Sequence, residues 1–523
     1  MSSITIERQK QKQPAARPAR RVGLIIPPSA FLLDERVFVS LGLLKIAGTL
    51  EAAGHQVNVL DLSGIKNYIE ALDAYLATST DTAIGLTATT PQLPAVFEIA
   101  RAIRRRRPDI RLILGGPHVT LTVAARKLEA RLDRPRGRAA RAFAQLASTF
   151  DTLVAGDGEL AVLHAVEPDA PALLDGDDNK GPFFMTDAMF DASPWPARHL
   201  VDMSTYRYAI EGHSATSLIA QLGCPFNCGF CGGRNSKSLR VIRTRTTQSI
   251  VAEMEHIHRT YGHTGFMFYD DELNVSKSVI ELMHAITDLQ MRLGVEFRLR
   301  GFMKAELFTE AQAKAMYGAG FRWLLCGFEA ANPRILANIE KRAKLEDNSR
   351  AVDIAKRHGL KVKALMSLGH PGETERSALD VRDWLVGAGV DDFDCSIITT
   401  YPGTPYYDRA VPHDTLEGVW TYTQPATGDR LHACEVDFTQ TPDYYKGDPD
   451  GGYKAYVFSD YVTSAELVQL RDTIERDVRK ALNIPFNASR ASMRFEHSMG
   501  QGLPDFILRA SASTPHPAGI QAR

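Results

Sequence analysis

Three cysteines in the middle of this 523-residue chain have the spacing of a metal-binding motif. Cys224, Cys228 and Cys231 stand as C-x-x-x-C-x-x-C, whereas the other cysteines are scattered singly. Soft thiolates at this spacing can surround one metal centre, either zinc or an iron–sulfur cluster. A structural zinc site commonly uses four ligands in two C-x-x-C pairs, and the sequence has no second pair. Three ligands without a fourth favour a cluster with one open position, as a reaction centre requires, and leave zinc as the alternative.

Strand-like and helical patterns alternate around these cysteines, from residue 209 to residue 410. The cysteines come directly after the first of six strand-like segments. Six such repeats predict a partial (β/α)6 barrel, whose chemistry sits at the carboxyl ends of the strands. The expected strands are Ser217–Gln221, Gly265–Tyr269, Glu296–Leu299, Trp323–Cys326, Lys361–Leu368 and Asp394–Thr399. The expected helices include Gln248–Tyr261, Ser276–Leu293, Thr309–Ala319 and Glu346–His358.

Residues 21–175 show a second alternation of strand and helix. This pattern predicts an α/β domain with a doubly wound, Rossmann-like parallel sheet, whose ligands would bind beyond the carboxyl ends of the strands. Those ends carry mostly small or hydroxylated residues and lack the G-x-G-x-x-G dinucleotide fingerprint, so ordinary turns remain the alternative to a ligand site. The expected strands are Arg21–Pro28, Gln56–Asp61, Thr82–Thr87, Arg111–Leu114 and Thr152–Ala155.

For the remaining segments, amino-acid composition predicts which are ordered and which are disordered. We expect a disordered basic tail at 1–20, a linker at 176–208, a mixed C-terminal capping region at 411–510 and a disordered tail at 511–523. The capping region contains an expected helix at Ser464–Leu482. It also contains an aromatic-rich stretch, which either faces substrate or packs as a cap; its residues are Tyr444, Tyr445, Lys446, Tyr453, Lys454, Tyr456 and Tyr461.

The overall composition limits the kinds of molecule that we expect this protein to bind. With 61 basic and 62 acidic residues the net charge is −1, which provides no general attraction to nucleic acid or to an anionic membrane. The apolar runs are shorter than the roughly 20 residues that span a bilayer, and no signal-peptide pattern is present. Six cysteines in a chain of this length suit a reducing compartment. We therefore expect a cytoplasmic protein that acts on a small molecule, without membrane or nucleic-acid partners.

The cysteine spacing, with Phe230 before the last cysteine, resembles that of the radical S-adenosylmethionine (radical SAM) superfamily. The resemblance implies that Cys224, Cys228 and Cys231 hold a [4Fe–4S] cluster whose fourth iron is chelated by SAM. An external one-electron donor of flavodoxin or ferredoxin type would then drive cleavage of SAM to a 5′-deoxyadenosyl radical. A cluster-bearing binding or redox-sensing protein without turnover is the competing hypothesis.

Further segments resemble the same superfamily. Three consecutive acids end the second expected barrel strand, and the resemblance implies that one of them receives the α-ammonium of SAM: Asp270, Asp271 and Glu272. Glu329, after the fourth strand, is an implied SAM contact. Arg300, on the third strand, reaches SAM or pairs with the acidic turn. His370 replaces an apolar residue of the Gly-Leu-Pro-Gly-Glu-Thr turn, where it has either a particular role or the ordinary one of a hydrogen-bonded, solvated turn residue.

A doubly wound domain ahead of such a barrel is the layout of cobalamin-dependent radical SAM enzymes of the class B methyltransferase type. The resemblance implies a cobalamin-dependent C-methyltransferase acting on a small metabolite or natural-product intermediate, with non-methylating radical chemistry as the alternative. No Asp-x-His-x-x-Gly motif supplies a lower cobalt ligand here, and some proteins of this architecture do not use the cofactor. The implied cobalamin contacts are Thr89, Thr90, Gly115, Gly116, His118, Gly156 and Glu159.

Overall fold

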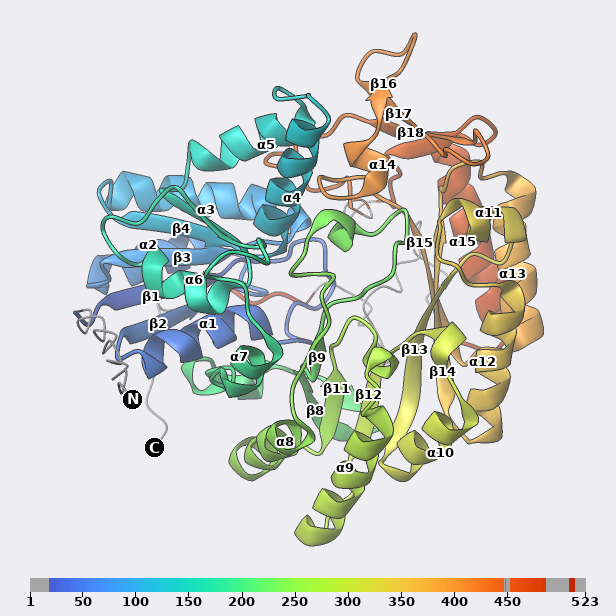
Figure 1. Cartoon of the computed structure of the whole chain (residues 1–523), viewed down its shortest axis with the longest axis horizontal. Coiled ribbons are helices and arrows are strands. Elements are labelled where there is room, and N and C mark those ends of the chain that lie inside the picture. The colour runs from blue at the N-terminus through green and yellow to red at the C-terminus, as the bar shows by residue number, and fades with distance from the viewer. Residues whose placement is uncertain (1–17, 446, 448–451, 486–507, 513–523) are drawn as a thin grey trace, which may run out of the picture.

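The computed structural model describes residues 18–445, 447, 452–485 and 508–512. An N-terminal parallel sheet and a half-barrel stand side by side, and a small antiparallel sheet lies at one end of the interface between them (Figure 1). This arrangement confirms the fold class expected from the sequence. The disordered tails expected at 1–20 and 511–523 fall almost entirely outside the described residues.

The N-terminal sheet is wholly parallel, with strand order β2-β1-β3-β4-β5-β6. The five strands expected from apolar runs are all present. A sixth, β6, was not expected, because its sequence Leu-Leu-Asp-Gly is short and runs into a polar turn. The strands are β1 (Arg21–Ile26), β2 (Gln56–Asp61), β3 (Ala83–Thr87), β4 (Arg111–Gly115), β5 (Thr152–Gly156) and β6 (Leu173–Gly176).

Helices cover both faces of this sheet, as a doubly wound fold requires. One face packs against α1 (Leu41–Ala52) and α6 (Gly158–Ala165) around a core that includes Val22, Leu44 and Ala161. The other face packs against the remaining helices around a core that includes Ile84 and Val96. These helices are α2 (Tyr68–Thr78), α3 (Leu93–Arg106), α4 (Pro117–Arg131) and α5 (Arg138–Ala147), with the short 3-10 helix η1 (Thr90–Gln92) before α3.

The segment expected as a linker is a packed connection between the two sheets. It contains α7 (Asp187–Ala192), η2 (Arg198–Leu200) and η3 (Met203–Thr205). Arg198 is buried, pairs with Glu253 of the half-barrel at 2.7 Å and donates to the Ser217 carbonyl at 2.9 Å. Glu253 also pairs with Arg245, so one buried carboxylate neutralises two guanidinium groups. Charge pairing therefore joins the linker sequence to the half-barrel.

The half-barrel sheet has strand order β15-β14-β13-β12-β11-β8-β7, parallel except for the antiparallel edge strand β7. All six expected barrel strands are present, with shifts at their ends. The strands are β7 (Ala209–Ile210), β8 (His213–Leu218), β11 (Gly265–Phe268), β12 (Arg298–Met303), β13 (Phe321–Glu329), β14 (Lys361–Leu368) and β15 (Asp392–Ile397). The outer helices are α8 (Thr247–Tyr261), α9 (Val279–Leu293), α10 (Glu310–Gly318), α11 (Pro333–Asn338), α12 (Leu345–Arg357) and α13 (Glu375–Ala388). Short elements in the loops are η4 (Gly232–Asn235), η5 (Leu273–Val275), η6 (Ala305–Leu307) and the pair β9 (Gln221–Leu222) and β10 (Arg243–Thr244).

Side chains of α15 (Ser464–Ala481) close the open edge of the half-barrel at β15. Arg471 donates to the Cys395 carbonyl at 3.0 Å, and Arg479 donates to the Phe393 carbonyl at 2.9 Å. The carboxylate of Glu475 accepts from the Cys395 amide at 3.2 Å and pairs with Arg479 at 2.8 Å. An edge strand exposes a row of unpaired backbone groups, and α15 satisfies them here without adding a strand.

The C-terminal region bridges the other two parts. Its antiparallel sheet follows α14 (Pro405–Asp408), and Tyr407, Phe438 and Tyr444 join the core of the N-terminal domain. Leu508 and Ala510 form isolated bridges to residues 34 and 65 of that domain. Among the expected substrate-facing tyrosines, Tyr444 and Tyr453 are buried in the cores, which favours the capping interpretation; Lys446 lies outside the described residues. The strands are β16 (Val411–Pro412), β17 (Val419–Thr423), β18 (Arg430–Cys434) and β19 (Val457–Ser459).

None of the described helices is both long enough and apolar enough to cross a bilayer.

The contacts of α15 generate a stability prediction. We expect Glu475→Ala to destabilise the half-barrel by about 3 kcal/mol, because it leaves two buried guanidinium groups short of a counterion. This loss corresponds to a fall of about 6 °C in the thermal midpoint, measured by scanning fluorimetry. Gln469→Ala, an exposed position on the same helix, is the matched control. Equal midpoints for the two variants would contradict the role given to Glu475.

Candidate active site

The loop that carries the three cysteines is held in shape by the segment that follows it. Gly223 opens the loop with φ of 88°, and a Cβ there would lie 2.2 Å from the carbonyl oxygen of Val241, so only glycine fits. The guanidinium of Arg240 donates to the carbonyls of Pro225 and Phe226 at 2.6 and 2.8 Å. The amide of Cys224 donates to the Leu239 carbonyl at 2.9 Å. The loop is therefore fixed by residues 239–241 independently of any metal.

Burial raises the pKa of the Cys224 and Cys228 thiols, to about 11 for Cys224, whereas Cys231 is exposed. At Cys228 the positive charges of Lys341 and Lys304 lower the pKa and so oppose the effect of burial. In the described part of the chain no three His, Cys, Asp or Glu side chains converge on a single ion. In a [4Fe–4S] cluster each thiolate ligates a different iron, so the three sulfurs need not converge on one point. Three mutually interacting thiols beside two lysines suit an anionic cluster.

Charged side chains gather beside Cys228 at the carboxyl ends of β11, β12 and β13. Lys304 pairs with Glu306 at 2.8 Å, and Lys341 pairs with Glu329 at 3.5 Å. Burial raises the pKa of Glu272 to about 7, while Lys341 and Lys304 pull it down. Its Oε2 atom is buried without a hydrogen-bond partner. The methionyl group of SAM is a zwitterion, so paired acids and lysines with an orphaned carboxylate oxygen fit it.

The three consecutive acids after β11 have different surroundings. One carboxylate oxygen of Asp270 accepts from the Ala220 and Gln221 amides, the former at 3.0 Å. Asp271 accepts from the Gly223 amide at 3.0 Å. Asp270 and Asp271 thus order the backbone that leads into the cysteine loop. Glu272 is the member of the three that lies among the lysines.

His370 belongs to a buried hydrogen-bond chain that leads to Glu329. Ser367 donates to Glu329 at 2.9 Å, and the Nε2 of His370 lies 2.8 Å from the Ser367 hydroxyl. Burial lowers the pKa of His370 to about 3, so the ring is neutral, and it packs edge-on against Phe230 at 5.5 Å. Glu329 itself has φ of 69°, a left-handed conformation that is rare outside glycine and is maintained here by these contacts. His370 is therefore no solvated turn residue, because it supports a strained carboxylate.

Arg300 lies deeper in the half-barrel than the other expected SAM contacts. It is 1% exposed, and its guanidinium covers the ring of Trp323 at 4.9 Å. It lies within β12, whereas Lys304 directly follows the end of that strand. Its Nε and Nη2 atoms are buried without a hydrogen-bond partner, so its expected contact with SAM stays a prediction.

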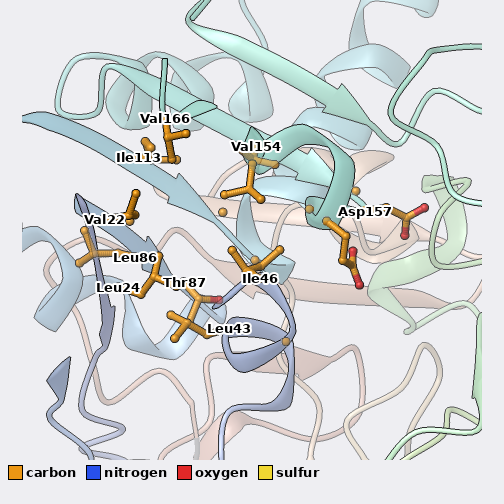
Figure 2. Close-up of a pocket in the computed structure, with 18 of the residues that line it drawn as sticks. Val22, Leu24, Leu43, Ile46, Leu86, Thr87, Ile113, Val154, Asp157 and Val166 are labelled. Atoms are coloured by element: carbon orange, nitrogen blue, oxygen red, sulfur yellow. The ribbon is translucent and has the colours of Figure 1, made fainter. Parts of the chain in front are cut away.

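An apolar cavity of about 230 Å³ opens at the carboxyl edge of the N-terminal sheet, between the sheet and α1 and α6. Figure 2 shows its side chains, which are mostly aliphatic; Thr87, Asp157 and Glu159 add polar groups. Glycines form much of its wall: Gly42, Gly85, Gly115, Gly116, Gly156 and Gly158. Such a wall lets a large, flat ligand approach the sheet, and this space fits the nucleotide end of cobalamin.

The expected cobalamin contacts divide into two sets. Gly115, Gly116, Gly156 and Glu159 line the cavity. His118 is fully buried, with its ring nitrogens 3.0 and 3.2 Å from the hydroxyls of Thr90 and Thr122. Both nitrogens are therefore occupied within the protein.

Thr89 also has a structural position. It forms a capping box with Gln92 at the start of η1. None of Thr89, Thr90 and His118 is in the cavity wall.

Asp157 connects this cavity to the cysteine loop. Its carboxylate lines the cavity, accepts from the Met185 amide at 3.0 Å and pairs with Arg243. Asp177, after β6, accepts from the Ser236 hydroxyl at 2.5 Å and from the Ser238 amide at 2.8 Å. Two carboxylates of the N-terminal domain thus hold the segment that follows the cysteines.

Several residues of the site were not expected from the sequence. Lys304 directly follows β12 and Lys341 lies in the loop after α11, neither of them in a recognisable motif, and Ser367 lies inside the apolar strand β14. Gly85 could have been predicted from the sequence. A glycine inside a strand weakens the strand and often marks a place where a ligand or another backbone approaches closely. Lys341 stands between Glu340 and Arg342, both with positive φ, and this strain is visible only in the structure.

Comparison with known proteins agrees with this geometry. Residues 218–385 match the family model of the radical SAM superfamily, and residues 35–147 match that of the B12 binding domain. The chain is 25% identical to the uncharacterized methyltransferase PH0819 of Pyrococcus horikoshii, over 76% of this chain and 84% of that protein. It is 24% identical to the anaerobic magnesium-protoporphyrin IX monomethyl ester cyclase of Rubrivivax gelatinosus, over 65% of this chain and 61% of that protein.

A solved structure shares the fold across nearly the whole chain. It is that of the radical S-adenosylmethionine methyltransferase TsrM from Kitasatospora setae, with cobalamin and a [4Fe–4S] cluster bound. The TM-score is 0.63 at 18% identity, covering 89% of this chain and 91% of TsrM. At this identity the likeness is one of fold. The two family matches show that the chain carries a B12-binding domain ahead of a radical SAM domain.

Proposed function

We propose that this enzyme is a cobalamin-dependent radical SAM C-methyltransferase that acts on a small metabolite or natural-product intermediate. The observation that carries the proposal is the direct link between the cavity and the cysteine loop. Asp157 lines the cavity and pairs with Arg243, twelve residues after Cys231. A corrinoid in the cavity and a cluster on the loop would therefore face one shared reaction space, as methyl transfer to a carbon radical needs.

The residues of the chain have separate tasks in this proposal. When bound, the cluster and SAM supply radical chemistry and cobalamin supplies the transferable methyl group. Glu272 and Glu329 bind the ammonium of SAM, and Lys304 and Lys341 bind its carboxylate. Asp270 orders the backbone entering the loop. The apolar wall of the cavity orients the corrinoid and excludes water.

Partners follow from the same chemistry. The enzyme takes electrons from an external one-electron donor of flavodoxin or ferredoxin type. Its substrate is a small molecule that enters between the two sheets. The cyclase relative makes non-methylating radical chemistry the alternative outcome.

The central experiment follows the methyl group of SAM. Under anaerobic reducing conditions, the reconstituted enzyme is incubated with hydroxocobalamin and SAM labelled with ¹³C in its methyl group. We expect release of S-adenosylhomocysteine and transfer of the label to the corrinoid fraction, measured by mass spectrometry. SAM cleavage to 5′-deoxyadenosine without any loss of the labelled methyl would instead favour the non-methylating alternative. Absence of any SAM turnover would favour a redox-sensing protein.

Two cysteine variants provide the controls for this experiment. Cys228→Ala should lose cluster iron and all 5′-deoxyadenosine formation. Cys434→Ala removes a cysteine outside the motif and should keep both. Equal iron contents in the two variants would contradict the cluster assignment.

Glu272→Gln tests which acid binds SAM. We expect at least tenfold weaker SAM binding, because a charge-assisted hydrogen bond contributes about 1.5–3 kcal/mol. Binding is measured by anaerobic calorimetry on cluster-loaded protein, with iron content as a check on loading. Glu281→Gln, on the exposed face of α9, makes the same chemical change as a control. Unchanged affinity in Glu272→Gln with normal iron would rule out this contact.

Gly85→Val tests the cavity. Its Cβ would approach the flexible end of Leu24 at 2.9 Å, so the strand can accept the side chain while the cavity is filled. We expect at least tenfold weaker retention of hydroxocobalamin, measured by absorbance after desalting, with a stability cost of about 1–3 kcal/mol. Gly387→Val, on an exposed face of α13 with open space around it, is the control. Full retention by a folded Gly85→Val protein would place cobalamin elsewhere.

A further inference from the structure

A second cavity, of about 590 Å³, lies between the N-terminal domain and the C-terminal region. One wall is the α4–α5 connection, and the other is α14 with β16 and β17 (Figure 1). It shares no lining residue with the cavity beside α1 and α6. The proposed function uses none of its side chains.

Arg138 is the central group of this cavity. Its side chain is only 5% exposed, and its guanidinium lies 3.7 Å from the ring centroid of Tyr407 and 4.3 Å from that of Trp420. Nε pairs with Glu435 at 3.2 Å, whereas Nη1 is buried without a hydrogen-bond partner. Two aromatic rings therefore hold the planar guanidinium in place, and its Nη1 donor group remains without a partner.

The rim of the cavity adds positive charge. Arg134, Arg136 and Arg141 are exposed, and none of them forms an ion pair with a carboxylate among the described residues. An anion placed in the cavity would therefore meet four guanidinium groups.

The two acids that line the cavity do not neutralise this charge by pairing with the arginines. Both oxygens of Glu129 accept from the backbone, at the amides of Ala139 and Ala140, 2.9 and 2.8 Å away. Asp408 accepts from the Gly403 amide at 2.9 Å and from the Asn235 side chain at 2.8 Å.

The remaining wall is apolar. It is made by Pro135, Ala410, Val411 and Pro412, together with the ring of Trp420. A cavity of this size exceeds what an inorganic anion needs. The combination of a fixed guanidinium and an apolar wall matches a molecule with an anionic group at one end and an apolar body at the other.

We propose that this cavity is a binding site for a small organic anion, whose carboxylate or phosphate group pairs with Arg138 and whose body packs against the C-terminal sheet. The proposal is independent of the proposed function, since it requires no cluster and no cobalamin. The site lies near the cysteine loop, because Asn235, which Asp408 holds, belongs to η4 directly after Cys231. An anion bound in this cavity would therefore lie near the reaction centre without being part of it.

Calorimetry on the full-length protein in low-salt Tris buffer tests the proposal with three matched probes. Phenyl phosphate and benzoate carry the two anionic groups, and benzyl alcohol is the neutral analogue. We expect saturable binding of at least one anion with a dissociation constant of about 1 mM or lower, and no binding of the alcohol. A preference for phenyl phosphate assigns a phosphate ligand, and a preference for benzoate assigns a carboxylate. The proposal would be overturned if benzyl alcohol bound as tightly as the anions, or if neither anion showed saturable binding.

Variants locate the binding. Arg138→Gln should weaken anion binding at least tenfold, because it removes the charge-assisted pair. The double change Arg134→Gln and Arg136→Gln alters only exposed residues, so it should leave the fold intact, weaken binding about two- to fivefold and reduce its salt dependence. Arg105→Gln, on an exposed part of α3, should change nothing.

The variants also define what would reject the site. Wild-type affinity in folded Arg138→Gln protein would place the anion elsewhere. If the small anions fail but an acidic flavodoxin binds and the double rim variant abolishes its binding, the surface is a protein docking site and the proposal is wrong.

Discussion

The active site depends on two buried carboxylates of the N-terminal domain, Asp157 and Asp177. They hold the segment from Ser236 to Arg243, which in turn holds the cysteine loop through Arg240. Buried charged hydrogen bonds are costly to break, because either partner alone would remain desolvated. The loop position is therefore set by the opposite domain. This constraint brings the apolar cavity and the cysteines into one site.

The barrel side of the site is a concentration of buried charge. Glu272, Lys304 and Glu329 stand at the ends of β11, β12 and β13, and Lys341 joins them from the loop after α11. Several neighbouring side chains have unsatisfied atoms. Such groups are expensive to bury unless a ligand completes them. The left-handed backbone of Glu329 adds strain at the same place. Unsatisfied charge and backbone strain at this place suit the zwitterionic end of SAM, which we propose binds here.

Much of the fold could be predicted because hydrophobic patterning is local. Apolar runs separated by helical stretches correctly predicted five strands of one sheet and six of the other. The short strand β6 and the C-terminal antiparallel sheet were missed, since brief, mixed-polarity strands have no periodic signal. Of the expected cobalamin contacts, Gly115, Gly116 and Gly156 line the cavity and His118 does not. A sequence cannot show that the hydroxyls of Thr90 and Thr122 lie beside both ring nitrogens of His118.

By itself the sequence determined the order of the two domains and predicted the three cluster ligands, because both depend on residue type and on spacing along the chain. Cysteine spacing of this kind limits the ligand geometry whatever surrounds it. Only the tertiary structure separated Glu272 from Asp270 and Asp271 and brought Lys341 to the cysteines. Those roles depend on which groups remain without a partner once distant segments pack, and on how burial changes the cost of their charge.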